Sequence, residues 1–207
     1  MLGDMTFSAA QRNKLAQLLI ELGPDAPTLC EGWETKDMAA HLWIRENRVD
    51  AAAGMFISKL ENRLENLTQE TLSRNYEDVV NEWAAGPPRW LKGIDTKMNT
   101  MEHFIHYEDV RRANGMTDSQ PLSDAANKQL YSALKMLASS ALRKSASPVV
   151  LHPHGFDRIV TADKKGISAN GGDVIRVSGE VGELLLWASG RDVADITING
   201  DVSKVAR

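Results

Sequence analysis

The sequence predicts a mainly α-helical bundle followed by a small α+β domain. Apolar residues recur at three- and four-residue intervals as far as Arg143, which is the spacing of amphipathic helices. The stretch Lys144 to Pro148 interrupts this pattern, and the rest of the chain carries short apolar runs separated by turn residues. We therefore expect a helical domain over residues 1–145 and an α+β domain over residues 146–207.

The helices of the first domain are expected where apolar stripes meet recognisable end signals. Ser8 and Gln11 have the spacing of a capping box, so the first helix should begin at Ser8 and end at Gly23-Pro24. Thr35 is the expected N-cap of the second helix, which should run to about Phe56. The other three helices are expected over roughly 69–85, 96–113 and 123–143.

The last part of the chain alternates with the shorter period of strands. Strands are expected over roughly 149–151, 158–162, 174–177 and 195–198. Residues 179–189 should form a helix that is anchored by Leu184, Leu185 and Trp187. These elements together predict the small α+β domain.

Composition and charge exclude several classes of protein. The formal net charge of -4 argues against a general nucleic-acid-binding protein, which usually carries a basic surface. The single cysteine, Cys30, excludes an intrachain disulfide and a thiolate cluster, so any metal must be held by His, Asp or Glu. No apolar run is long enough to span a bilayer, and the first residues lack a signal-peptide pattern. We expect a cytoplasmic protein, monomeric or homodimeric, with neither a nucleic acid nor a membrane as partner.

Two of the predicted helices direct polar side chains toward the bundle interior. Glu102 and His106 are four residues apart, so they lie one above the other, beside the apolar residue Ile105. On the second helix, His41 follows Met38 by three residues and precedes Leu42, which also directs it inward. The spacing therefore predicts that His41, Glu102 and His106 face the same interior.

A divalent metal would account for these inward polar residues. A buried carboxylate without a partner costs several kcal/mol. Two histidines and one carboxylate leave one coordination position open, which is typical of a catalytic rather than a structural zinc site. Two alternatives need no metal: His41 is a hydrogen-bonded core histidine, and Glu102 and His106 are a hydrogen-bonded pair on one helix.

Two further residues bear on this hypothesis. His103 is a competing ligand, but it should point about 100° away from Glu102 on the helix. Asp109 follows Glu102 by seven residues on the same side and could orient a ligating histidine. A simple salt bridge from Asp109 to Arg112 or Arg45 is the alternative.

Three segments resemble the mycothiol-dependent maleylpyruvate isomerase family, which belongs to the DinB-like metal-binding bundles. Residues Thr28 to Leu42 (TLCEGWETKDMAAHL) resemble its N-terminal loop and the Asp-x-x-x-His-Leu helix that follows. Residues Asn99 to Asp109 (NTMEHFIHYED) resemble its Glu-x-x-x-His stretch. Residues Gly182 to Arg191 (GELLLWASGR) resemble more loosely the helix and Gly-Arg turn of its second domain.

The resemblance implies a DinB-like four-helix bundle that binds zinc through His41, Glu102 and His106. It also implies a low-molecular-weight thiol cofactor, mycothiol in the characterised members. The metal would favour the thiolate, which is the nucleophilic form, and the thiolate would attack a small electrophilic substrate. The implied reaction is an isomerisation if the thiol then leaves, or a transfer if it stays attached.

The resemblance leaves several roles open. Arg45 could anchor a carboxylate of the substrate or of the thiol, or it could form an ordinary ion pair with Glu102 or Asp109. Arg191 could bind the cofactor or could be an exposed helix cap. Trp33 and Trp43 could form the wall of a pocket or simply pack against their neighbours.

Two alternatives to the thiol-dependent enzyme remain. One is a non-catalytic, metal-binding or stress-related DinB-like protein, and the other is a metallohydrolase.

Overall fold

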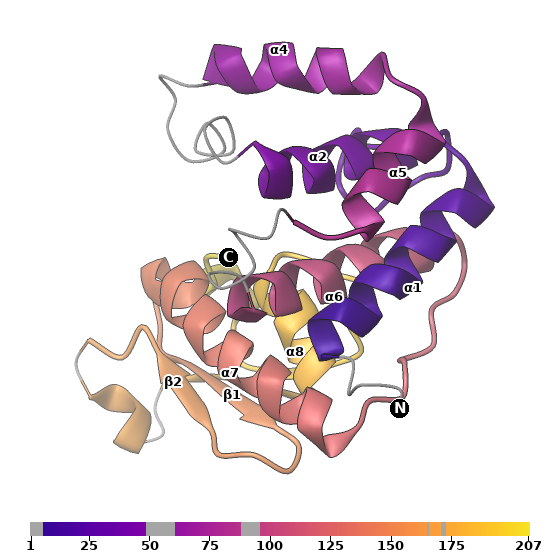
Figure 1. Ribbon diagram of the computed structural model, residues 1–207. Coiled ribbons are helices and arrows are strands. Elements are labelled where there is room, and N and C mark those ends of the chain that lie inside the picture. The colour runs from indigo at the N-terminus through magenta and orange to yellow at the C-terminus, as the bar shows by residue number, and fades with distance from the viewer. Residues whose placement is uncertain (1–5, 49–60, 88–95, 165, 171–172) are drawn as a thin grey trace. The chain divides into compact units, whose positions relative to one another are not determined.

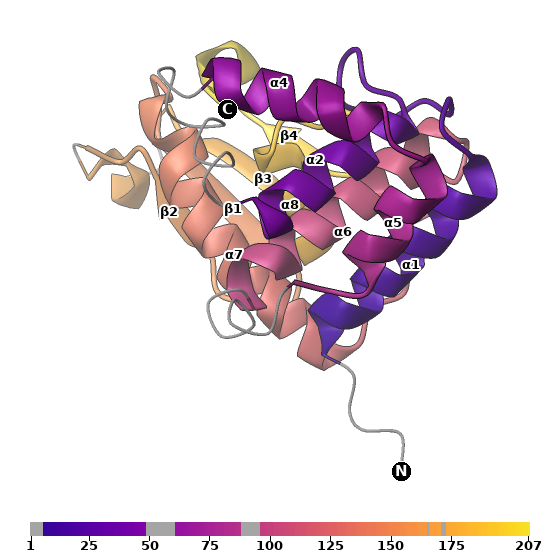
Figure 2. The ribbon, with the colours of Figure 1, turned by 45° about the horizontal axis from the view of Figure 1, so that its top comes forward.

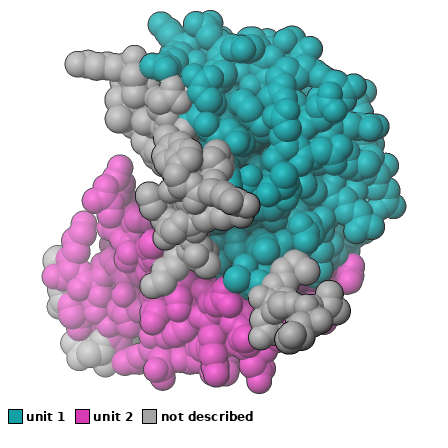
Figure 3. Space-filling view, viewed as in Figure 1, with its two compact units in different colours: residues 1–117 teal, residues 118–207 magenta. Residues whose placement is uncertain are grey.

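A computed structural model describes residues 6–48, 61–87, 96–164, 166–170 and 173–207. The chain divides into two compact units, Met1–Thr117 and Asp118–Arg207 (Figure 3). The first unit is a helical bundle, and the second combines helices with a small sheet. The mainly α-helical fold with an α+β tail is therefore confirmed.

Five helices are described in the first unit. They are α1 (Phe7–Leu22), α2 (Thr35–Asn47), α4 (Glu61–Leu72), α5 (Tyr76–Ala84) and α6 (Thr96–Ala113). Helices α1, α2, α5 and α6 contribute to one apolar core, and α4 packs on α2 in a smaller cluster. Helix α1 packs along α6, and α5 contacts both α1 and α2 (Figures 1 and 2). The core is built from fully buried side chains that include Leu15, Leu19, Met38, Leu42 and Trp83.

The first two helices begin at residues other than the expected ones. Thr6 is the N-cap of α1, because its hydroxyl accepts a hydrogen bond from the backbone N–H of Ala9. The expected start at Ser8 is therefore wrong by one residue. Glu34 is the N-cap of α2, and its N–H donates to Asp37 at 2.9 Å in a capping box.

Thr35, which was expected to cap α2, has a different role. Its buried hydroxyl donates to the carbonyl of Gly23 and accepts from the N–H of Ala26 at 3.2 Å, so it fixes the loop that leads into the helix. At its other end α2 stops at Asn47, and Arg48 has left the helical conformation with φ -128° and ψ 63°. The expected continuation over 49–56 lies outside the described residues.

The single helix expected over 69–85 is wrong, because the chain forms two helices there. Helix α4 ends at Leu72, and α5 begins at Tyr76. The side chain of Asn75 accepts a hydrogen bond from the N–H of Asp78 at 3.1 Å and so caps α5. This cap starts a new helix inside a region whose apolar pattern is continuous.

The second unit is built on a four-stranded sheet and two helices. Its elements are α7 (Asp124–Ala141), β1 (Val149–Pro153), β2 (Ile159–Thr161), β3 (Ile175–Gly179), α8 (Val181–Ala188) and β4 (Thr197–Asn199). The strand order is β2-β1-β3-β4, in which β1 and β3 are parallel and the two outer pairs are antiparallel. Helix α8 contacts the two central strands as well as α7, so every one of its residues is buried.

The division between the two units falls at residues 117 and 118, whereas the sequence predicts a boundary at residues 145 and 146. The difference arises from α7, which belongs to the second unit because it packs against α8 and β2. Its amphipathic pattern shows one apolar face, but it does not show which partner covers that face. Among the helices of the described residues, none combines the length and the apolar content needed to cross a membrane.

Candidate metal centre

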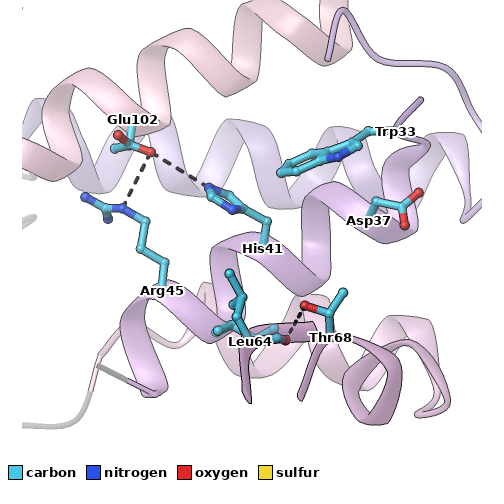
Figure 4. A pocket seen from close by; sticks show the side chains of 8 residues that line it. Trp33, Asp37, His41, Arg45, Leu64, Thr68 and Glu102 are labelled. Carbon is cyan, nitrogen blue, oxygen red and sulfur yellow. Dashed lines mark hydrogen bonds and ion pairs between the residues drawn. The ribbon is translucent and has the colours of Figure 1, made fainter. Parts of the chain in front are cut away.

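Helices α2 and α6 bring together the three residues that the sequence singles out as ligands. The candidate ligand atoms of His41, Glu102 and His106 all lie within 4.8 Å of one another. Glu102 Oε2 is 3.4 Å from His106 Nε2 and 4.0 Å from His41 Nε2. Figure 4 shows His41 and Glu102 facing each other across the site. Three donor atoms thus converge on one small volume.

The chemistry of these atoms fits a divalent cation. His41 Nε2 is buried, and within the described part of the chain it has no hydrogen-bond partner. A buried polar atom without a partner costs about 1–3 kcal/mol, and a cation between the three side chains would supply the missing interaction. Two imidazole nitrogens and a carboxylate oxygen match the ligands that zinc takes in proteins.

Asp109 fixes the orientation of the His106 ring. Its Oδ2 lies 3.0 Å from His106 Nδ1, and its side chain is completely buried. In the neutral ring this carboxylate holds the proton on Nδ1. The lone pair of Nε2, which faces Glu102, is then the one that can bind a metal. The geometry therefore supports the orienting role for Asp109.

Cys30 extends this contact in a way that the sequence did not indicate. Its Sγ donates to Asp109 Oδ2 at 3.4 Å, and the backbone N–H of Leu29 donates to the Asp109 carbonyl at 3.1 Å. Cys30, His106 and Asp109 form a second group whose ligand atoms lie within 4.8 Å of one another. Asp109 and His106 already bond each other through Nδ1. We therefore infer that Cys30 and Asp109 hold His106 in place for the His41, Glu102 and His106 group and do not form a second metal site.

Arg45 stands beside the carboxylate of the site. Its Nε is 3.5 Å from Glu102 Oε2, and its Nη1 donates to the side-chain oxygen of Asn99. The ion pair with Glu102, one of the two expected alternatives, is thus present. Arg45 also lines the adjoining pocket, so its position is compatible with the second alternative, the binding of an anionic group.

Burial and charge set the protonation states of the three candidate ligands. Burial lowers the pKa of His41 more strongly than Glu102 raises it, so this imidazole is neutral at pH 7. Burial opposes ionisation of Glu102, but His106, His41 and Arg45 outweigh it and hold the pKa of that carboxyl well below its usual range. Burial likewise opposes a charge on His106, but Asp109, then Cys30 and Glu102, raise its pKa well above the ordinary value.

The raised pKa of His106 predicts that a metal must displace a proton from this ring. Below that pKa the metal competes with the proton, so metal affinity should rise as the pH rises and level off once His106 is neutral. We expect about one proton to be released per zinc bound at pH 7. Calorimetric titration in two buffers with different ionisation enthalpies measures this number.

The substitution Asp109→Asn provides the control for proton release. It removes the interaction that contributes most to raising the His106 pKa, so fewer protons should be released at pH 7. Equal release from the Asp109→Asn variant and the wild type would contradict the assigned role of Asp109.

A pocket of about 380 Å³ adjoins the candidate ligands. It is lined by Trp33, Asp37, His41, Ile44, Arg45, Leu64, Thr68 and Glu102 (Figure 4). The Trp33 ring lies 5.0 Å from the His41 ring, so Trp33 forms a wall of the pocket, as one of its two expected roles requires. Trp43 is not among the lining residues and donates its indole N–H to Glu82 at 2.8 Å.

His103, the competing histidine, belongs to a different cluster. It is fully buried, with Nε2 3.0 Å from Glu46 Oε1 and Nδ1 3.0 Å from the carbonyl of Ser8. Both ring nitrogens therefore have partners away from Glu102. Glu46 was not among the expected site residues, although its position four residues after Leu42 continues the apolar stripe of α2.

Arg191 lies in the second unit, in the turn that follows α8. Its backbone N–H donates to the carbonyl of Leu186 at 3.0 Å, and its Nη1 donates to that of Ser189 at 2.6 Å. These bonds close the end of the helix. The predicted cofactor contact of Arg191 stays a prediction.

Among the comparisons with known proteins, only the comparison of structures found a match. No protein-family model matches the chain. No curated protein matches it in sequence. The crystal structure of the mycothiol-dependent maleylpyruvate isomerase is similar over 98% of this chain and 95% of its own, with a TM-score of 0.65 and 15% identity. A histidine-to-alanine mutant of that isomerase is similar over the same fractions, with a TM-score of 0.60 and 13% identity. The resemblance predicted from the motifs is thus confirmed for the fold.

Proposed function

We propose that this chain, which has the fold of the mycothiol-dependent maleylpyruvate isomerase, is a metal- and thiol-dependent isomerase or transferase. It would act on a small electrophile, with a low-molecular-weight thiol such as mycothiol as cofactor, in the cytoplasm. The observation that carries the proposal is the buried Nε2 of His41, which has no hydrogen-bond partner among the described residues and faces Glu102 and His106 at the wall of a pocket.

Each residue of the site has a definite task in this proposal. His41, Glu102 and His106 would hold a divalent ion, for which zinc is our first choice, and Asp109 would keep the His106 ring in its ligating orientation. The ion would lower the pKa of the cofactor thiol and so favour the thiolate. In the described part of the chain the ligand group contains three residues, which supports a position left open for the thiol.

The pocket would place the electrophile beside the thiol. A bound thiolate would supply the nucleophile for an electrophilic carbon of the substrate; its later release would complete an isomerisation, and its retention would complete a transfer. Trp33 and Leu64 would contribute apolar surface to this pocket.

The substitution Arg45→Met tests the role of the cation at the pocket. If Arg45 anchors an anionic group, loss of this charge-assisted contact should raise the KM for an anionic substrate about tenfold, with a smaller change in kcat. Steady-state kinetics of the zinc-loaded protein with maleylpyruvate and mycothiol measures both constants. An unchanged KM would show that Arg45 contacts Glu102 and Asn99 but binds no anionic group of the substrate.

The proposed function itself is tested by turnover and by thiol binding. The zinc-loaded protein should convert an electrophile only when both thiol and metal are present, and a chelator should stop the reaction. Saturable binding of mycothiol without turnover of any electrophile would favour the non-catalytic metal-binding or stress-related protein. Metal binding without affinity for the thiol would contradict the proposal.

A further inference from the structure

A buried polar cluster holds four helices of the first unit together. The carboxylate of Glu46 on α2, only 4% exposed, pairs with Arg12 of α1 at 2.6 Å. It also accepts from the indole N–H of Trp83 on α5 at 3.0 Å and lies 3.0 Å from His103 Nε2 on α6. We call these four residues the Glu46 cluster. Because each member comes from a different helix, the position of its carboxylate is fixed within the bundle.

Asn99 connects the Glu46 cluster to the candidate metal centre. Its side-chain nitrogen donates to Glu46 Oε1 at 3.4 Å, and its side-chain oxygen accepts from Nη1 of Arg45. The two ends of the amide are not interchangeable here, because a carboxylate only accepts hydrogen bonds and a guanidinium only donates them. Asn99 is itself 2% exposed, so both bonds are shielded from water.

The connection restrains a side chain that would otherwise be free to move. An arginine side chain loses about 2 kcal/mol of rotamer entropy when it is held in one conformation. The contact between Arg45 Nε and Glu102 leaves the guanidinium free to turn about that one contact. A second bond, from Nη1 to Asn99, fixes the plane of the group at the pocket wall.

We propose that Asn99 is a positioning residue, which holds the guanidinium of Arg45 at the pocket by tying it to the Glu46 cluster. The use of this arrangement for an anionic substrate or thiol rests on the proposed function. The restraint of Arg45 by Asn99 does not, and it can be measured in protein that has never been shown to turn over a substrate.

The direct test is the NMR signal of the Arg45 Nη1–H2 group, which donates to Asn99. In wild-type protein this signal, identified by its absence from the Arg45→Lys variant, should be shifted from the free-arginine position, with solvent exchange slowed about tenfold or more. Leucine has nearly the same size as asparagine but no hydrogen-bonding group. In Asn99→Leu the signal should therefore move to the position of free arginine, and its protons should exchange quickly with solvent. Asn99→Asp keeps an acceptor for Arg45, so the signal should stay shifted.

Two controls separate positioning from a general loss of structure. Met101→Leu lies on the same helix and removes no hydrogen-bonding group, so it should leave the Arg45 signal in place. The indole N–H signal of Trp83 reports whether the Glu46 cluster is intact in each variant. If Asn99→Leu does not fold, Asn99→Ala takes its place. An unchanged Arg45 signal in a folded Asn99→Leu or Asn99→Ala variant would overturn the proposal.

Kinetics then separates this inference from the proposed function. In an active enzyme, Asn99→Leu should raise the KM for an anionic substrate about tenfold, as Arg45→Met does, with little change in kcat. A merely structural role would lower the amount of folded protein without raising KM. If no variant shows thiol-dependent turnover, the proposed function fails, while the NMR result still decides the role of Asn99.

Discussion

The variants His41→Ala, Glu102→Ala and His106→Ala should each lose zinc that wild-type protein binds in a 1:1 ratio. Each substitution removes one of three converging donor atoms. Loss of an outer partner of a metal ligand already costs about 10–100-fold in affinity, so loss of a ligand should exceed 100-fold. Elemental analysis of protein purified without a histidine tag, followed by competition with a chromophoric chelator, measures the content and the affinity.

The matched control for this experiment is a histidine outside the site. His154 is exposed and lies 2.9 Å from Glu180, so His154→Ala should retain the full zinc content. Failure of the wild-type protein to bind zinc or another divalent ion on reconstitution would refute the metal centre. The inward polar residues would then form a hydrogen-bonded core network.

The substitution Glu46→Ala should lower the free energy of unfolding by about 3–5 kcal/mol, the usual cost of removing one partner of a buried ion pair. Arg12 would keep a buried charge without its carboxylate, and the indole N–H of Trp83 and the His103 ring would each lose an acceptor. Urea denaturation of the metal-free protein measures the change, since a bound metal would add its own stabilisation.

Glu82 offers a closely matched control. It pairs with Arg74 at 2.5 Å and accepts from the indole N–H of Trp43 at 2.8 Å, so its partners are of the same kinds as those of Glu46. Its side chain is 51% exposed, and exposed pairs of this kind contribute at most about 1 kcal/mol. If Glu46→Ala and Glu82→Ala lowered the free energy of unfolding by similar amounts, burial would not be what makes the Glu46 cluster strong.

The sequence predicts best those features that depend on the spacing within one helix. Residues 96–113 form α6 with the expected limits, and the four-residue spacing of Glu102 and His106 places both on one face. Their meeting with His41 depends on where α2 lies relative to α6 in the bundle, which spacing alone does not determine. The family resemblance supplied that step.

Contacts between residues that are far apart in the sequence could not be predicted from it, and the contacts of Glu46 are the example. Glu46 continues the apolar stripe of α2, and a charged residue at such a position is a signal that could have been noticed. Its partner Arg12 is 34 residues earlier and its partner His103 is 57 later, so no local pattern connects them.

Helix α6 also limits which changes in length a related sequence could accept. Asn99 and His103 face Glu46, while Glu102, His106 and Asp109 face the candidate metal centre. One inserted or deleted residue turns everything beyond it by about 100°, which would break one set of contacts or both. In an alignment, a gap between residues 99 and 109 would therefore mark a relative that lacks this site, however well the rest of its fold agrees.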